Sequence, residues 1–168
     1  AVGTASITMG GAISGNSDSP AFVTLRAADN VTISKLVNLN SSFIENDGGD
    51  LVVDAAAGSA VITSNVNANG GGNAQGGTVE IGAGLDVTIG DIMDVSGGDF
   101  DGGSVDITAG RDLTIARSIL ANSNSGGGFG GEILFDAGRD LIVNGVSALN
   151  RTRIETSGST DLENFAGD

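Results

Sequence analysis

The stretch GGSVDITAGRDLTI at residues 102–115 decides the fold of this chain. It contains two short segments in which apolar and polar residues alternate, and a small-residue corner, Ala109-Gly110, lies between them. Alternation with a period of two is typical of a strand that buries one of its faces. Closely similar stretches occur at residues 76–89 (GGTVEIGAGLDVTI) and 130–143 (GGEILFDAGRDLIV). These copies indicate a repeat protein.

The alanine at the corner gives the period of the repeat. It recurs at intervals of 28, 28, 26 and 28 residues, as Ala27, Ala55, Ala83, Ala109 and Ala137. In most copies, apolar residues lie two and four positions before it and four and six positions after it. A third apolar patch follows, near Leu36-Val37, Ile92-Met93, Ile119-Leu120 and Val146. The copy that begins at residue 48 has AAAGSAVIT at its corner, which indicates a two-residue insertion.

Three short strands per period cannot bury their inner faces within one copy, whereas stacking each copy on the next buries them all. The sequence therefore predicts an all-β fold: a right-handed parallel β-helix of about six rungs of about 28 residues, spaced about 4.8 Å apart. The rungs are expected at residues 1–19 (partial), 20–47, 48–75, 76–101, 102–129, 130–157 and 158–168 (partial). The side chains expected to point inward are Val79, Ile81, Val87, Ile89, Val105, Ile107, Leu113, Ile115, Ile133, Phe135, Leu141 and Val143.

Pairs of glycines precede the first strand of most copies. They are Gly48-Gly49, Gly76-Gly77, Gly102-Gly103 and Gly130-Gly131, with Pro20 at the same place in the first full rung. A corner of the coil needs a positive φ or a close approach of two backbones, and glycine allows both. We therefore expect the glycine pairs to mark one corner. The third side varies most between copies, which predicts loops along one edge.

Both ends of the chain lie inside the repeat pattern. The last four residues, 165–168, repeat the corner motif, and the first seven, AVGTASI, continue it as a second strand. The 168 residues are therefore expected to form a single β-helix segment of a longer array. No capping repeat, which a solenoid end usually carries, is evident in the sequence.

Composition excludes several classes of function. The formal net charge of −14 argues against binding to nucleic acid, because phosphate contacts need clustered Lys and Arg, and against binding to anionic membrane surfaces. The absence of Cys excludes disulfides and zinc–thiolate sites. The sequence has no apolar run of about 18 residues, so no membrane helix is expected. The first residues have no signal-peptide pattern.

Three aspartates at one register of the repeat, Asp86, Asp112 and Asp140, have Asn30 as their counterpart in an earlier rung. Stacked carboxylates suggest a ladder of Ca²⁺ ligands. The preferred interpretation is a turn residue whose side chain hydrogen-bonds the local backbone. The neighbouring Arg111 and Arg139 would offset the repulsion between the carboxylates, which weakens the case for a metal.

Two other groups of residues are candidates for chemistry. Asp99 and Asp101, in GGDFDGG, would either hold Ca²⁺ or form a solvated turn with Phe100 tucked in. For a carbohydrate-active enzyme, Asp86, Asp106, Glu80 and Arg111 could be proposed as the reacting groups. Glu80 and Asp106 are expected to face outward one rung apart, at a separation that a retaining glycosidase would also need.

Neither group is assigned a function, because any stacked acidic ladder has the same spacing and the chain has no His. A threonine ladder of the ice-binding kind, formed by Thr32, Thr88 and Thr114, is interrupted by Ile142. We assign no catalytic, cofactor-binding or metal-binding residue and expect no cofactor.

The phrase GGSVDITAGRDLTI, with its diglycine corner, alternating strand, Ala-Gly corner and Asp-Leu-Thr-Ile strand, resembles the shaft repeats of filamentous-haemagglutinin-like bacterial exoproteins, the large adhesins of two-partner secretion. The resemblance extends over residues 19–168. It implies a large secreted bacterial protein whose right-handed parallel β-helix acts as a stalk or adhesive fibre. The secretion domain of that family carries an Asn-Pro-Asn-Gly motif, which is absent because Pro20 is the only proline. The resemblance therefore implies that this chain is part of the shaft and not of the secretion domain.

The expected function is that of a structural, non-enzymatic shaft segment of a secreted or cell-surface bacterial adhesin. Expected partners are adjoining repeats or further copies end to end, together with glycans or proteins of a neighbouring surface, but no nucleic acid and no inserted membrane. One alternative is a filament or sheath subunit that assembles end to end, because uncapped rungs invite stacking. A second alternative is a carbohydrate-active β-helix enzyme.

Overall fold

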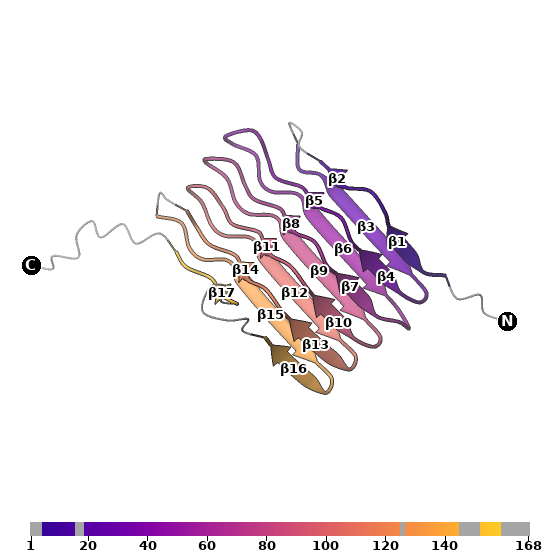
Figure 1. The fold of residues 1–168 in the computed structure, drawn as a ribbon. Coiled ribbons are helices and arrows are strands. Elements are labelled where there is room, and N and C mark those ends of the chain that lie inside the picture. Colours follow the sequence, from indigo (N-terminus) through magenta and orange to yellow (C-terminus); the bar gives the residue numbers. More distant parts are fainter. Residues whose placement is uncertain (1–4, 16–18, 125–126, 145–151, 159–168) are drawn as a thin grey trace, which may run out of the picture.

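The computed structural model describes residues 5–15, 19–124, 127–144 and 152–158. These residues form a parallel β-solenoid of about five turns, in which strands of successive turns lie side by side (Figure 1). The described residues contain strands and no helix. The prediction of an all-β parallel coil is therefore confirmed.

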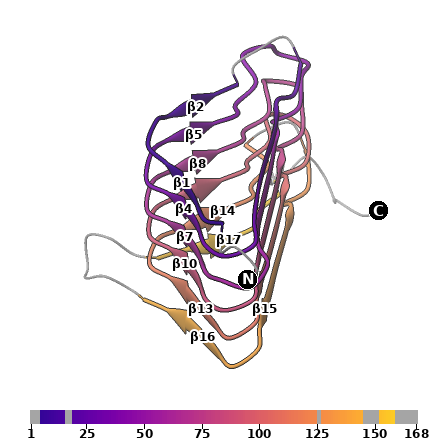
Figure 2. The same ribbon diagram turned by 90° about the vertical axis from the view of Figure 1, so that its right-hand side faces the viewer.

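Each turn contributes one strand to each of three sheets, which surround the interior (Figure 2). The long-strand sheet contains β3 (Phe22–Ala27), β6 (Asp50–Ala55), β9 (Thr78–Ala83), β12 (Ser104–Ala109) and β15 (Glu132–Ala137). The middle sheet contains β1 (Ile7–Met9), β4 (Val31–Ile33), β7 (Ala60–Ile62), β10 (Val87–Ile89), β13 (Asp112–Ile115) and β16 (Asp140–Val143). The short-strand sheet contains β2 (Ile13–Ser14), β5 (Val37–Asn38), β8 (Val66–Asn67), β11 (Met93–Asp94), β14 (Ile119–Leu120) and β17 (Ile154–Glu155).

The strands pair in the register that the repeat predicts. Ala109 lies beside Ala83 and Ala137, and Ile107 lies beside Ile81 and Phe135. Ile7 pairs with Val31 in a second-side strand, so of the stretch expected there at residues 1–7 the strand contains Ile7, and residues 1–4 lie outside the described residues. Equivalent residues of successive copies therefore form continuous ladders along the solenoid.

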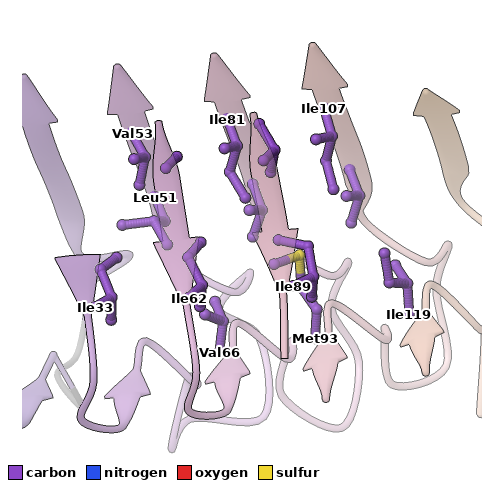
Figure 3. Close-up of a cluster of buried hydrophobic side chains, with 14 of the residues drawn as sticks. Ile33, Leu51, Val53, Ile62, Val66, Ile81, Ile89, Met93, Ile107 and Ile119 are labelled. Carbon is purple, nitrogen blue, oxygen red and sulfur yellow. The ribbon is translucent and has the colours of Figure 1, made fainter. Parts of the chain in front are cut away.

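The core consists of these stacked aliphatic ladders (Figure 3). Ile81 and Ile107 are fully buried between the sheets, and each such side chain contributes about 1.5–3 kcal/mol of stability by leaving water. The predicted inward residues that are buried are Val79, Ile81, Val87, Ile89, Val105, Ile107, Leu113 and Ile115.

The four predicted inward residues of the last described rung are less protected. Ile133 and Phe135 are half-buried and pack against the core. Leu141 and Val143 keep the inward register but are 49% and 45% exposed, because no further described strand lies on β16. The prediction that these four side chains are buried is therefore wrong, because they lie where the described coil ends.

The corner insertion in the second full rung is one residue long, so the expected length of two is wrong. Ala60 pairs with both Val31 and Val87, although it lies one position further from its corner alanine than they do from theirs. An insertion of one residue reverses which side chains point inward. It buries Ile62 and turns Val61 outward, which places the larger aliphatic side chain in the core.

The third side of the coil is the short-strand sheet. Val37, Val66, Met93 and Ile119 point inward and are fully buried. The expected next member, Val146, lies outside the described residues, and Ile119 instead pairs with Ile154. The last rung therefore contains additional residues before its third strand. The corner motif expected at residues 165–168 also lies outside the described residues.

The glycine pairs mark one corner, as predicted, and their physical role is close approach. Among the described glycines only Gly127 has a positive φ. A β-carbon on Gly76 would overlap the carbonyl oxygen of Val95, near the end of the same rung, and one on Gly103 would overlap the carbonyl oxygen of Gly77. Any side chain here would force neighbouring backbones apart.

Candidate functional surfaces

The first candidate is the acidic corner between the long-strand and middle sheets. Arg111 Nε donates to Asp86 Oδ1 at 2.8 Å, and Arg111 Nη2 contacts Asp86 Oδ2. Arg139 Nε donates to Asp112 Oδ1 at 2.7 Å, and Arg139 Nη2 contacts Asp112 Oδ2. Each arginine thus makes a bidentate contact with the aspartate of the preceding rung, which is the strong geometry for an Arg–carboxylate pair.

These ion pairs shift the acid–base equilibria at the corner. The hydrogen bond from Arg111 lowers the pKa of Asp86 from its usual 3.8, against the opposing effect of desolvation. The same contact raises the pKa of Arg111, and the hydrogen bond to Asp112 raises the pKa of Arg139. Asp86 is therefore held in its charged form by a cation supplied within the chain.

The corner side chains also bind the backbone of the next rung. The Ser59 N–H donates to Asn30 Oδ1 at 2.8 Å, and the Asp112 N–H donates to Asp86 Oδ1 at 3.3 Å. Asp140, the last member, lies 3.4 Å from Arg139 Nε. Among the described residues, no group of three or more His, Cys, Asp or Glu gathers closely enough to hold a metal ion. These corner side chains do accept backbone hydrogen bonds, but from the next rung and not from the local backbone that the preferred interpretation expected.

A second polar ladder, which was not predicted from the sequence, runs along the loop side of the short-strand sheet. Its members are Asn40, Asn69, Ser96, Asn122 and Ser157. The Asn69 N–H donates to Asn40 Oδ1 at 2.9 Å, and the Ser96 N–H donates to Asn69 Oδ1 at 2.9 Å. The signal in the sequence was an Asn three residues after the inward residue of the third strand, in three of the rungs.

The residues before the glycine pairs form a third connection. The Gln75 N–H donates to Asp47 Oδ1 at 3.0 Å, and the Phe129 N–H donates to Asp101 Oδ1 at 2.8 Å. Asp101, a candidate Ca²⁺ ligand, therefore accepts from the next rung, while the Asp99 N–H donates to the Gly72 carbonyl at 2.6 Å. Phe100 is 54% exposed, so the expectation that it is tucked in is wrong.

The outer face of the long-strand sheet brings together the two carboxylates considered for catalysis. Glu80 and Asp106 are register partners in β9 and β12, and both are exposed. They line a shallow hollow of about 230 Å³ with Thr78, Ser104, Val105, Glu132 and Leu134. Arg111 does not contact either of them in the described structure, because its guanidinium is paired with Asp86.

The outer face of the middle sheet carries the threonine ladder. Thr32, Thr88 and Thr114 lie in one row, as predicted. Besides Ile142, Val61 also interrupts the row, because the one-residue insertion turns it outward. The face is therefore a mixture of hydroxyl and aliphatic groups.

Comparisons of the chain with protein-family models, with curated proteins and with solved structures gave no match. In the part of the chain that the structure describes, no helix is long and apolar enough to cross a membrane.

Proposed function

We propose that this chain is a structural shaft segment of a long secreted or cell-surface bacterial adhesin or fibre. The observation that carries the proposal is that polar side chains form hydrogen bonds to the adjacent rung. Asp86, Asp112, Asn40, Asn69 and Asp101 hydrogen-bond the next rung instead of converging on one another. Such side chains join successive turns, as a rod requires.

The rest of the coil supports the same role. Backbone ladders run through three sheets, and the buried ladders of Val, Ile and Leu are continuous from rung to rung. A repeat stacked in this way is quasi-one-dimensional, so adding rungs lengthens the rod without changing its section. The net charge of −14 favours solubility and disfavours lateral aggregation of such rods.

Electron microscopy of the native material, labelled with antibodies raised against this chain, tests the proposal. We expect thin rods of fixed length, with label at a constant position, at both low and high protein concentration. Label confined to compact particles, or found only inside the producing cells, would overturn it. Small-angle X-ray scattering of the 168-residue chain adds a check on shape.

The alternative is an extracellular filament that assembles end to end. It draws on the exposure of Leu141 and Val143 on the inner side of β16 and on the edge of that strand with which no other described strand pairs. Sedimentation over a range of concentrations separates the two models. A mass that grows with concentration supports assembly, and a constant mass supports a covalent shaft.

The second alternative is a carbohydrate-active enzyme, which draws on the adjacent, outward-facing Glu80 and Asp106. Release of reducing ends from bacterial and plant polysaccharides measures such an activity. An activity that is present in the native chain and lost in both Glu80→Gln and Asp106→Asn would replace the shaft proposal. Equal rates in all three proteins would assign any activity to a contaminant.

A further inference from the structure

The four loops on the third side of the coil form one edge of the solenoid, visible in Figure 1 at the end of the rungs opposite the tight corners. Their described residues are 40–48, 69–76, 96–102, 122–124 and 127–130. Four large apolar side chains on them are exposed, and the shaft proposal gives them no role: Phe43, Ile44, Phe100 and Phe129. We call these four residues, with the acidic Glu45, Asp47, Asp99 and Asp101, the loop-edge surface.

Three of the four exposed phenylalanines among the described residues lie on this edge, and the fourth, Phe22, is in the long-strand sheet. Phe129 is 76% exposed and Phe43 is 48% exposed, whereas the interior of the coil is filled by aliphatic side chains. Exposed phenylalanine costs free energy in water, and neighbouring exposed apolar groups on a soluble protein mark interaction sites. Aromatic residues are also enriched in protein interfaces.

The loops hold these residues on one supported surface. The Asn73 N–H donates to the Ile44 carbonyl, which joins the first loop to the second. The Asp99 N–H donates to the Gly72 carbonyl, which joins the second loop to the third. A β-carbon on Gly128 would touch the Phe100 backbone, so the fourth loop lies directly against the third. The apolar groups are therefore carried by stacked backbone and not by independent loops.

The surface is hollowed between rungs. A depression of about 250 Å³ is lined by Asp47, Asn73, Ala74, Gln75 and Phe100, which come from three successive loops. A second depression of about 500 Å³ is formed by residues 42–46 around Phe43 and Ile44. Side chains of a partner can enter both.

The charge of the loop edge favours a partner that carries positive charge. The four loops contain four carboxylates and neither Lys nor Arg, although the chain has seven basic residues elsewhere. A second copy would place carboxylates against carboxylates, and anionic surfaces would be repelled. We propose that the loop-edge surface docks a protein segment that presents apolar side chains together with Lys or Arg, a role additional to that of the shaft.

The test uses fluorescent peptides of stated composition as probes. Binding of a peptide of alternating Leu and Lys is measured by fluorescence anisotropy at about 0.15 M salt, where interactions between distant exposed charges are screened. The comparison peptides are one of alternating Ser and Lys and one of alternating Leu and Glu. We expect the Leu/Lys peptide to bind the native chain at least about tenfold more tightly than either comparison peptide, because both the apolar and the charged contacts are needed.

Two matched triple variants locate the site. Phe43→Ser/Ile44→Ser/Phe100→Ser removes apolar groups of the loop edge, and Leu85→Ser/Ile92→Ser/Leu134→Ser removes exposed apolar groups elsewhere. Circular dichroism checks that both remain folded. We expect the first variant to lose about tenfold or more in affinity for the Leu/Lys peptide, and the second to change by less than about twofold. Equal effects of the two variants would overturn the proposal.

Charge is tested in the same way. Glu45→Gln/Asp47→Asn weakens binding of the Leu/Lys peptide if the acidic groups take part, and Asp54→Asn/Asp106→Asn on the long-strand sheet serves as the control. Other occupants give different results. Dimerisation of the native chain that the loop-edge variant abolishes would overturn the proposal in favour of a second copy. Binding to a glycan array that this variant abolishes, with peptide binding unchanged, would overturn it in favour of a saccharide.

Discussion

The Gly103 backbone N–H donates a 2.7 Å hydrogen bond to the carbonyl oxygen of Val95, so residues 96–102 leave the coil and return to it at a closed neck. Equivalent bonds join Gly49 to Leu39, Gly77 to Ala68 and Gly131 to Ala121. Closure at the neck lets the loops differ in length without disturbing the strands. The interval of 26 residues between Ala83 and Ala109 contains the shortest of these loops.

The glycine pairs should be intolerant of side chains. Gly76→Ala should lower the free energy of unfolding by more than about 2 kcal/mol, because its β-carbon would overlap backbone atoms of Val95 and Gly103. Gly82→Ala is the matched control, since nothing lies within 4 Å of the position of its β-carbon. Urea denaturation of both variants measures the difference. Similar midpoints would contradict the close-approach role.

A charge in the inner ladder should unfold neighbouring rungs. Ile107 is fully buried, so Ile107→Asp should cost more than about 4 kcal/mol through an unpaired buried charge. Thr114→Asp places the same charge on the outward side of β13 and should cost less than about 1 kcal/mol. Thermal unfolding of the two variants gives the comparison. An Ile107→Asp variant as stable as the native chain would mean that the faces are assigned incorrectly.

The acidic corner should make stability depend on pH. Because Arg111 lowers the pKa of folded Asp86 below 3.8, this pair stabilises the fold above that pH and loses its effect as the pH falls through the folded-state pKa. Carbon-detected NMR titration should show the pKa of Asp86 rising in Arg111→Gln and staying unchanged in Arg26→Gln. Stability of the native chain and of Arg111→Gln should converge in acid. A difference that widens in acid would contradict the pairing.

The second polar ladder, which begins at Asn40, should tolerate only residues with an acceptor oxygen at its positions. Asn40→Ala leaves the partly buried Asn69 N–H without the side-chain oxygen that it contacts at 2.9 Å, so it should cost about 1–3 kcal/mol. Asn40→Asp keeps an acceptor at the same place and should recover much of that stability. Urea denaturation measures both variants, and hydrogen exchange at the Asn69 amide reports on the bond itself. Unchanged exchange in Asn40→Ala would exclude the ladder role.

Much of the fold could be predicted because each copy of the repeat carries the same alternation of apolar and polar residues at the same positions. Val79, Val105 and Ile133 occupy one register, and a period of two assigns each of them to the same face. The candidate residues were also placed correctly relative to one another, with Glu80 beside Asp106 and Asp112 beside Asp140. Stacking needs only the period and the alternation, and both are visible in one dimension.

Three features depended on the tertiary structure. The length of the insertion before Ala60 became clear only from strand pairing. Ala60 pairs with Val31, which leaves one extra residue at the corner and sets which side chains of the strand point inward. The contact of Arg111 with Asp86 joins residues 25 positions apart and depends on side-chain reach across a rung. The exposure of Phe100 depends on how three loops stack at the edge. The sequence by itself thus determined the coil, its period and its inward ladders. Only the tertiary structure decided which polar groups bind the next rung and which apolar groups remain on the surface, because those contacts depend on distances between rungs.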